Sequence, residues 1–160
     1  MNSRIIKEKK MPYIIFIGLL VIVDQLSKYE IDTRFFEGET FPIIGKFFHL
    51  TYVKNRGIAF GFFQGKLDVI SLITIFAIIA IGIYFYKTFK KSTLMEKLGY
   101  SFILGGAIGN IFDRIYRGFV VDMIDFRGIW SFVFNLADVW INIGVALILL
   151  DSFIKERRKK

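Results

Sequence analysis

Two aspartates in strongly apolar surroundings are the residues of this chain best suited to chemistry. Asp122 lies in the segment VVDMI, and Asp138 lies in the segment FNLADVW. An unpaired carboxylate is costly to keep in such surroundings, so ionisable groups there are functional candidates. Two converging carboxylates resist simultaneous ionisation and share a proton, which makes an acid–base pair. The sequence predicts this chemistry if the fold brings both aspartates together.

The composition indicates what kind of fold must position them. Of the 160 residues, 54% are hydrophobic and 18% aromatic, yet 22% are charged. Long apolar runs separated by charged clusters reconcile these values and are typical of a small polytopic membrane protein. We expect a mainly α-helical, single integral membrane domain over residues 1–160. Its four transmembrane helices are predicted at about 11–29, 67–85, 95–112 and 130–154.

The positive charge is distributed as a membrane topology requires. The net charge is +8, and the basic residues gather before the first predicted span, between the second and third, and after the fourth. The positive-inside rule assigns these segments, and both termini, to the cytoplasm. Residues 30–66 and 113–129 are then outer loops. We therefore expect no nucleic-acid partner.

The first outer loop contains strand-like sequence. Residues 47–53 are aromatic and β-branched, and residues 58–63 continue the pattern after the turn-like segment NRG at 55–57. We expect a small extracytoplasmic β-sheet from this loop, resting on the outer membrane surface.

Unusual polar residues fall at one depth in three predicted spans. With a rise of about 1.5 Å per residue, Asp138 lies about 10 Å below the outer boundary of its span. Asp24 and Lys28, four residues apart, share a helical face near the outer end of the first span. This convergence predicts a site, and its helical members are Asp24, Lys28, Asn110, Asp113, Arg114, Asn135 and Asp138.

Several of these residues also have structural interpretations. Asp24 and Lys28 can form an ion pair at a helix end. Asn55 suits a turn and Asn135 suits a helix cap. Asp113 and Arg114 can be charges at the edge of a span. We expect this boundary role for Arg117 and Arg127.

The sequence lacks the residues that other kinds of catalytic site require. The chain has no cysteine and a single histidine, His49, and it contains neither HExxH nor GxSxG. Thiolate catalysis and the usual zinc sites are therefore not expected, and we predict no metal and no cofactor. A proton-coupled carrier using Asp138 and Asp24 is the rival class. However, the polar groups gather at one membrane face and repeated halves are missing. A non-enzymatic membrane scaffold, the third class, suits buried carboxylates poorly.

Five segments in order resemble lipoprotein signal peptidase, the type II signal peptidase of bacteria. They are DQLSK at 24–28, NRGIAF at 55–60, GGAIGNIFDR at 105–114, VVD at 120–122 and FNLAD at 134–138. The resemblance covers essentially the whole chain. At one position it departs from the family pattern, with Ile58 where alanine is more common.

The resemblance implies an intramembrane aspartic endopeptidase of the bacterial inner membrane, with its active site toward the extracytoplasmic face. Asp122 and Asp138 would be its catalytic pair. The substrate would be a prolipoprotein whose cysteine carries diacylglyceryl, cleaved just before that cysteine, without a metal. We expect a monomer among membrane lipids. The supporting residues, for substrate binding, orientation of the carboxylates or the end of the first span, are Asn55, Gly57, Asn110, Asp113, Arg114, Asn135, Asp24 and Lys28.

Overall fold

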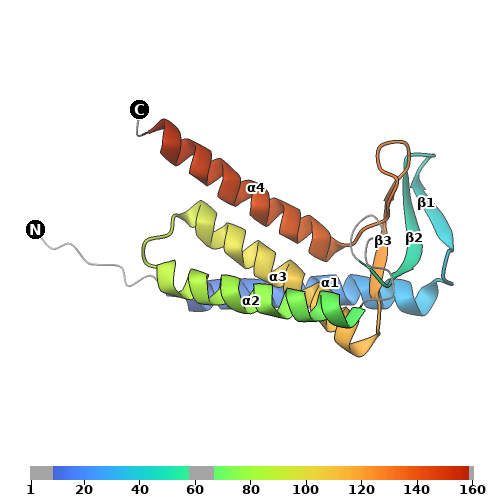
Figure 1. The fold of residues 1–160 in the computed structure, drawn as a ribbon. Helices are drawn as coiled ribbons and strands as arrows, with labels where there is room; N and C mark the ends of the chain where they lie inside the picture. Colours follow the sequence, from blue (N-terminus) through green and yellow to red (C-terminus); the bar gives the residue numbers. More distant parts are fainter. Residues whose placement is uncertain (1–8, 58–66, 159–160) are drawn as a thin grey trace, which may run out of the picture.

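A bundle of four helices carries a small β-sheet at one end. The computed structural model describes residues 9–57 and 67–158. The sheet lies beside the end of α1 and the start of α4, whereas the start of α1 and the end of α4 lie at the opposite end of the bundle (Figure 1). The elements are α1 (Met11–Arg34), β1 (Thr40–Ile44), β2 (Phe48–Asn55), α2 (Leu67–Thr88), α3 (Leu94–Tyr116), β3 (Val120–Phe126) and α4 (Leu136–Arg157).

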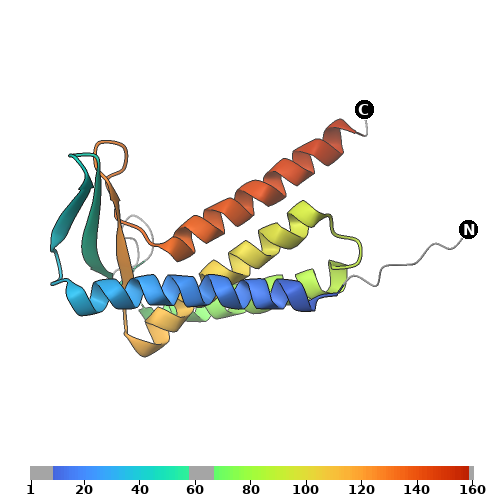
Figure 2. The ribbon, with the colours of Figure 1, turned by 180° about the vertical axis from the view of Figure 1, so that it is seen from behind.

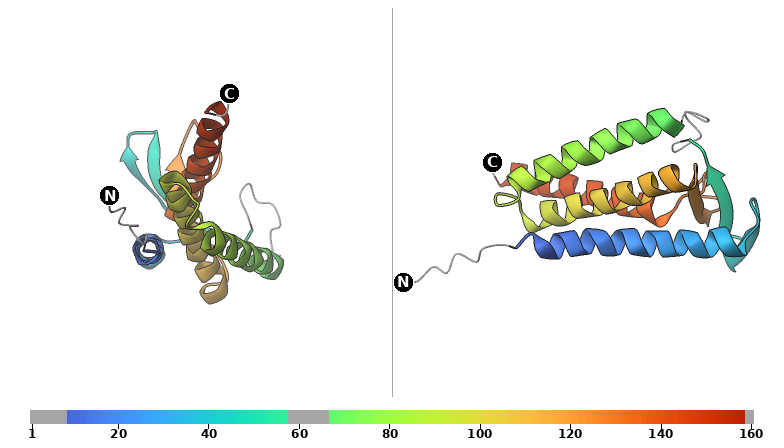
Figure 3. Two further views of the ribbon diagram at one scale, coloured as in Figure 1. Left: turned by 90° about the vertical axis from the view of Figure 1, so that its left-hand side faces the viewer. Right: turned by 90° about the horizontal axis from the view of Figure 1, so that it is seen from below.

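Helix α3 is the centre of the bundle. It lies between α1 and α2 and packs against both (Figure 3). Helix α4 runs antiparallel along α3, as Figure 2 shows from behind. Glycines allow this close approach: a Cβ on Gly106 would lie 2.3 Å from the carbonyl oxygen of Ala137, so only glycine fits.

The helices divide by polarity. Among the described residues, α2 (from residue 69) and α4 are long and apolar enough to cross a membrane. Both expose large apolar side chains, such as Ile73 and Leu149. Helices α1 and α3 carry buried charges: Asp24, Lys28 and Asp113 are fully buried, whereas Glu30 and Arg34 at the end of α1 are exposed.

Capping boxes fix the starts of α3 and α4. Thr93 accepts from the Glu96 backbone N–H while the Glu96 side chain accepts from the Thr93 N–H. Asn135 and Asp138 form the same reciprocal pair at α4. Each box satisfies two backbone donors that a helix start leaves without partners.

The sheet is antiparallel, in the order β1-β2-β3. Val53 of β2 lies opposite Asp122 of β3, and Asn55 lies opposite Val120. The sheet packs on the end of α1 through an apolar cluster of Ile31, Tyr52, Val121 and Met123.

Two expectations about this end of the molecule are wrong. The sheet does not come from the first loop alone, because its third strand lies in the segment 113–129, which places Asp122 on a strand. The fourth helix begins at Leu136 and not near residue 130, because Phe134 pairs with Ile124 of β3. The other helices extend a few residues beyond the predicted spans. The expected strand at 58–63 lies outside the described residues.

Candidate active site

Asn135 links the two aspartates. Its side-chain Nδ2 donates to Asp122 Oδ1 at 2.6 Å, and its backbone N–H donates to Asp138 Oδ2 at 3.3 Å. Its Oδ1 in turn accepts from the Asp138 backbone N–H at 3.0 Å. One residue, the N-cap of α4, therefore contacts both carboxylates, and the fold brings the two aspartates to the same place.

Asp122 is the more deeply buried of the two. It is 2% exposed, and its Oδ2 accepts from Asn55 Nδ2 at 2.9 Å. The Asn55 Oδ1 accepts from the Gly57 backbone N–H, which fixes the orientation of the amide. Burial, and after it the charge of Asp138, raises the pKa of Asp122 to about 7. This carboxyl can thus hold a proton near neutral pH.

Asp138 occupies the third position of α4 and is half-buried. Its Oδ1 accepts from Asn110 Nδ2 at 2.8 Å, in addition to the bond from the Asn135 N–H. The first turn of a helix stabilises a negative charge through the helix dipole. Asp138 is therefore held by two donors at the start of the helix.

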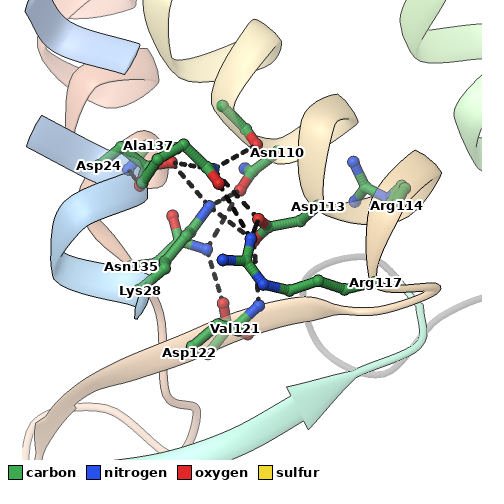
Figure 4. Close-up of polar contacts among 12 residues, drawn as sticks. Asp24, Lys28, Asn110, Asp113, Arg114, Arg117, Val121, Asp122, Asn135 and Ala137 are labelled. Atoms are coloured by element: carbon green, nitrogen blue, oxygen red, sulfur yellow. Dashed lines mark hydrogen bonds and ion pairs between the residues drawn. The ribbon is translucent and has the colours of Figure 1, made fainter. Parts of the chain in front are cut away.

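A buried ionic network lies next to Asn135 and Asn110 (Figure 4). Lys28 Nζ is 2.8 Å from Asp24 Oδ2 and 3.0 Å from Asp113 Oδ2, and all three side chains are fully buried. The same ammonium donates to Asn110 Oδ1 at 2.9 Å. Asp24 Oδ1 accepts from the Ala137 backbone N–H at 2.9 Å, so α1 also holds the start of α4. The expected helix-end ion pair is real, but it lies inside the bundle.

Sequence reasoning missed Arg117 as a member of this network. It pairs with Asp113 and lies 3.4 Å from Asp32 Oδ2, and it donates to Gln25 Oε1 at 2.9 Å. The ion pairs of Asp113 are with Lys28 and Arg117. A four-residue spacing from Asp113 was the signal that could have identified Arg117.

A cleft of about 1220 Å³ opens beside the two aspartates. Asn55, Asn110 and Arg114 line it together with the segment 130–135 and apolar side chains of α4. Arg114 Nη2 lies 3.5 Å from the Gly57 carbonyl oxygen, and its buried Nε has no hydrogen-bond partner within the described part of the chain. The cleft thus combines an apolar wall with the guanidinium of Arg114 and two carboxylates.

Asp125 of β3 and the neighbouring Arg127 do not line this cleft. Asp125, three residues after Asp122, accepts from Thr51 Oγ1 at 2.7 Å and from Arg127 Nε at 3.0 Å. Burial raises the pKa of Asp125, but the bonds from Thr51 and Arg127 and the Arg127 charge together outweigh it, so the pKa lies below its ordinary value. In residues 9–57 and 67–158, no three His, Asp or Glu side chains group as a metal site would require.

Comparison with known proteins matches the chain to one family. The family model for signal peptidase (SPase) II matches residues 16–154. Lipoprotein signal peptidase of Fusobacterium nucleatum is 53% identical over 150 residues, which are 94% of this chain and 91% of that protein. The Clostridioides difficile protein of the same name is 42% identical and covers 94% of this chain and 100% of its own length.

Two solved structures of bacterial membrane enzymes are similar to this chain. A bacterial membrane enzyme with 36% sequence identity superposes with a TM-score of 0.84 over 93% of this chain and 92% of its own. A second bacterial membrane enzyme, also 36% identical, gives a TM-score of 0.77 over 88% of this chain and 92% of its own. The chain is therefore a peptidase and a bacterial membrane protein that belongs to the signal peptidase II family.

Proposed function

We propose that this protein is an aspartic endopeptidase that removes the signal peptide from diacylglyceryl-modified prolipoproteins. Cleavage falls just before the lipidated cysteine. The single observation that carries the aspartic mechanism is the contact of Asn135 with both Asp122 and Asp138, from its side chain and its backbone. Substrate identity is supported by the relatives, which are named lipoprotein signal peptidase.

In the proposed reaction the two aspartates share one proton. The ionised carboxylate takes a proton from a water molecule as that water attacks the scissile carbonyl carbon. The protonated carboxyl donates a hydrogen bond to the carbonyl oxygen and then passes its proton to the leaving amine. Two carboxylates in poorly solvated surroundings resist double ionisation, which keeps the proton on the pair near neutral pH.

The neighbouring residues would hold substrate and carboxylates in place. Arg114 lines the cleft, and its guanidinium suits a peptide carbonyl or the ester of the lipid. Asn55, with its amide fixed by Gly57, orients Asp122, and Asn110 orients Asp138. Asp24, Lys28 and Asp113 hold the ends of α1, α3 and α4 together. The apolar wall of the cleft suits the acyl chains of the substrate.

The proposed topology is a monomer of four spans in the cytoplasmic membrane, forming one domain over residues 1–160. Both termini face the cytoplasm, and the sheet with the cleft faces outward. The basic residues after α2 and at the end of α4 lie at the bundle end opposite the sheet, in agreement with the positive-inside rule.

The function is tested with the purified full-length protein in lipid vesicles and a diacylglyceryl-modified prolipoprotein, with products read by mass spectrometry. Asp122→Asn and Asp138→Asn should both abolish release of the signal peptide. Asp125→Asn is the matched control, because its carboxylate lies on the same strand but bonds to Thr51 and Arg127. A wild-type rate in either of the first two variants would contradict the proposal. Proton transport without cleavage would favour a carrier.

A further inference from the structure

The amide of Asn110 is held between an ammonium and a carboxylate. Its Oδ1 accepts from Lys28 Nζ at 2.9 Å and from Asn135 Nδ2 at 3.2 Å. An ammonium has only donors, so the oxygen of the amide must face Lys28. Its Nδ2 must then face Asp138 Oδ1, at 2.8 Å.

This arrangement treats the two aspartates unequally. Asp138 receives a donor polarised by a buried positive charge, and it lies in the first turn of a helix. Polarised hydrogen bonds in a chain reinforce one another, and both features favour a carboxylate. Asp122 lies on a strand, is almost completely buried and receives its two bonds from neutral amides.

From this geometry we infer that Lys28 is a positioning residue for the reaction: through Asn110 it holds Asp138 as the ionised base and leaves the shared proton on Asp122. The inference rests on the proposed function. In the reaction, Asp138 would take the proton of the attacking water, and Asp122 would donate its proton to the leaving amine. After this step Asp138 is protonated and Asp122 is ionised. One proton then has to return from Asp138 to Asp122 before the next turnover.

Among the described residues, the other groups at the Lys28 ammonium are the carboxylates of Asp24 and Asp113, and Arg117 lies on the far side of Asp113. Arg114 of α3 and Lys54 of β2 are the other charged groups lining the cleft, and no described bond joins either of them to Asn110. The charge of Arg114 acts on both aspartates, and that of Lys28 acts on Asp122 as well. The hydrogen-bonded route from Lys28 to Asp138, however, passes through the single amide of Asn110.

The test is the pH dependence of single-turnover cleavage, with the enzyme in excess. The active form needs an ionised Asp138, so the rate falls on the acid side as that group gains a proton. Lys28→Met keeps the length of the side chain and removes its charge. The positive charge of Lys28 strengthens the hydrogen bond that favours the ionised form of Asp138. Its loss should therefore move the acid limb of the Lys28→Met rate profile to higher pH, by up to about one pH unit.

Asn110→Ala is the second variant, because it keeps the Asp24–Lys28–Asp113 ion pairs and so the fold. It should move the acid limb in the same direction even if Lys28→Met fails to fold. Arg117→Met is the matched control: it removes a charge from the same network without touching Asn110, so it should lower the melting temperature and leave the acid limb unchanged. Infrared titration of the carboxylic-acid band gives the same pKa for a variant that cleaves too slowly.

The outcomes separate the two proposals. If Lys28→Met and Asn110→Ala keep the wild-type acid limb, Lys28 is only structural and the inference is wrong. If Arg117→Met moves the acid limb as far as Lys28→Met does, the inference is also wrong. Removing any positive charge of the network would then have the same effect on Asp138. If the wild type does not cleave, or Asp138→Asn cleaves at the wild-type rate, the proposed function itself has failed.

Discussion

The side chain of Asn135 donates to Asp122 at 2.6 Å, and this bond joins the N-cap of α4 to the third strand of the sheet. The same side chain caps α4 through its oxygen. A helix start and a strand from different parts of the chain are thus fastened at the point where the two aspartates meet. The position of Asn135 therefore affects both stability and chemistry, and the two effects can be separated.

Asn135→Ser should separate them. Serine can still cap α4, so its stability should exceed that of Asn135→Ala by about 1 kcal/mol. Both variants lose the donor to the protonated Asp122, and a hydrogen bond between neutral groups contributes about 0.5–1.5 kcal/mol, so cleavage should slow by up to about tenfold in both. Thermal unfolding in detergent and cleavage rates of the same preparations check this. Wild-type cleavage by Asn135→Ser would show that the bond to Asp122 is dispensable.

The stability of the protein should depend on pH through Asp122. Its pKa is raised from 3.8 to about 7. The folded protein holds this proton up to about pH 7, whereas the unfolded chain releases it near pH 3.8, so folding becomes less favourable as the pH rises through this interval. Asp122→Asn should be more stable than the wild type above pH 7, and the difference should disappear toward pH 4. Unfolding midpoints measured across this range check the sign. An unchanged difference at all pH values would contradict it.

Two ion pairs on α1 offer a comparison of buried with exposed charge. Asp24–Lys28 and Glu30–Arg34 have the same four-residue spacing and lengths of 2.8 and 2.7 Å. The first pair is 0% exposed, whereas the glutamate and arginine are 54% and 71% exposed. Asp24→Asn should destabilise by about 3–5 kcal/mol. Glu30→Gln should change stability by less than about 1 kcal/mol. Equal losses in the two variants would mean that burial does not set the strength of the first pair.

The contact of α3 with α4 should not tolerate a methyl group. Gly106→Ala places a Cβ 2.3 Å from the Ala137 backbone oxygen, directly before Asp138. We expect a loss of about 1–3 kcal/mol, together with reduced cleavage because the start of α4 must move. Gly82→Ala is the control, since nothing lies within 4 Å of a Cβ there. That control should be neutral or slightly stabilising. The prediction fails if both variants melt at the same temperature.

Much of the site could be predicted from the sequence, because the depth of a residue in an apolar helix follows from its position along the chain. This is why Asp24, Lys28, Asn110 and Asp138 were expected at one level, and the structure brings them together. Their direct contacts depend on which helices pack together, and apolar spacing does not determine that.

The remaining features depend on long-range pairing. The segment VVDMIDF has β-branched residues suited to a strand, but its partner strand lies about 70 residues earlier, and register is set only by that pairing. The apolar run 130–134 looks helical until Phe134 pairs with Ile124. As a result, α4 begins directly after Asn135, which confirms the expected helix cap, and Asp138 lies in the first turn.

The most direct test of the central claim is a double-mutant comparison of the two aspartates. Single-turnover cleavage of a diacylglyceryl-modified prolipoprotein is measured for the wild type, Asp122→Asn, Asp138→Asn and the variant with both changes. When two groups act as a unit, removing either one lowers the rate as much as removing both. Each single variant should therefore fall to the same residual rate as the double variant. A double variant slower than either single variant by the product of their separate effects, or a single variant at the wild-type rate, would contradict a shared-proton pair.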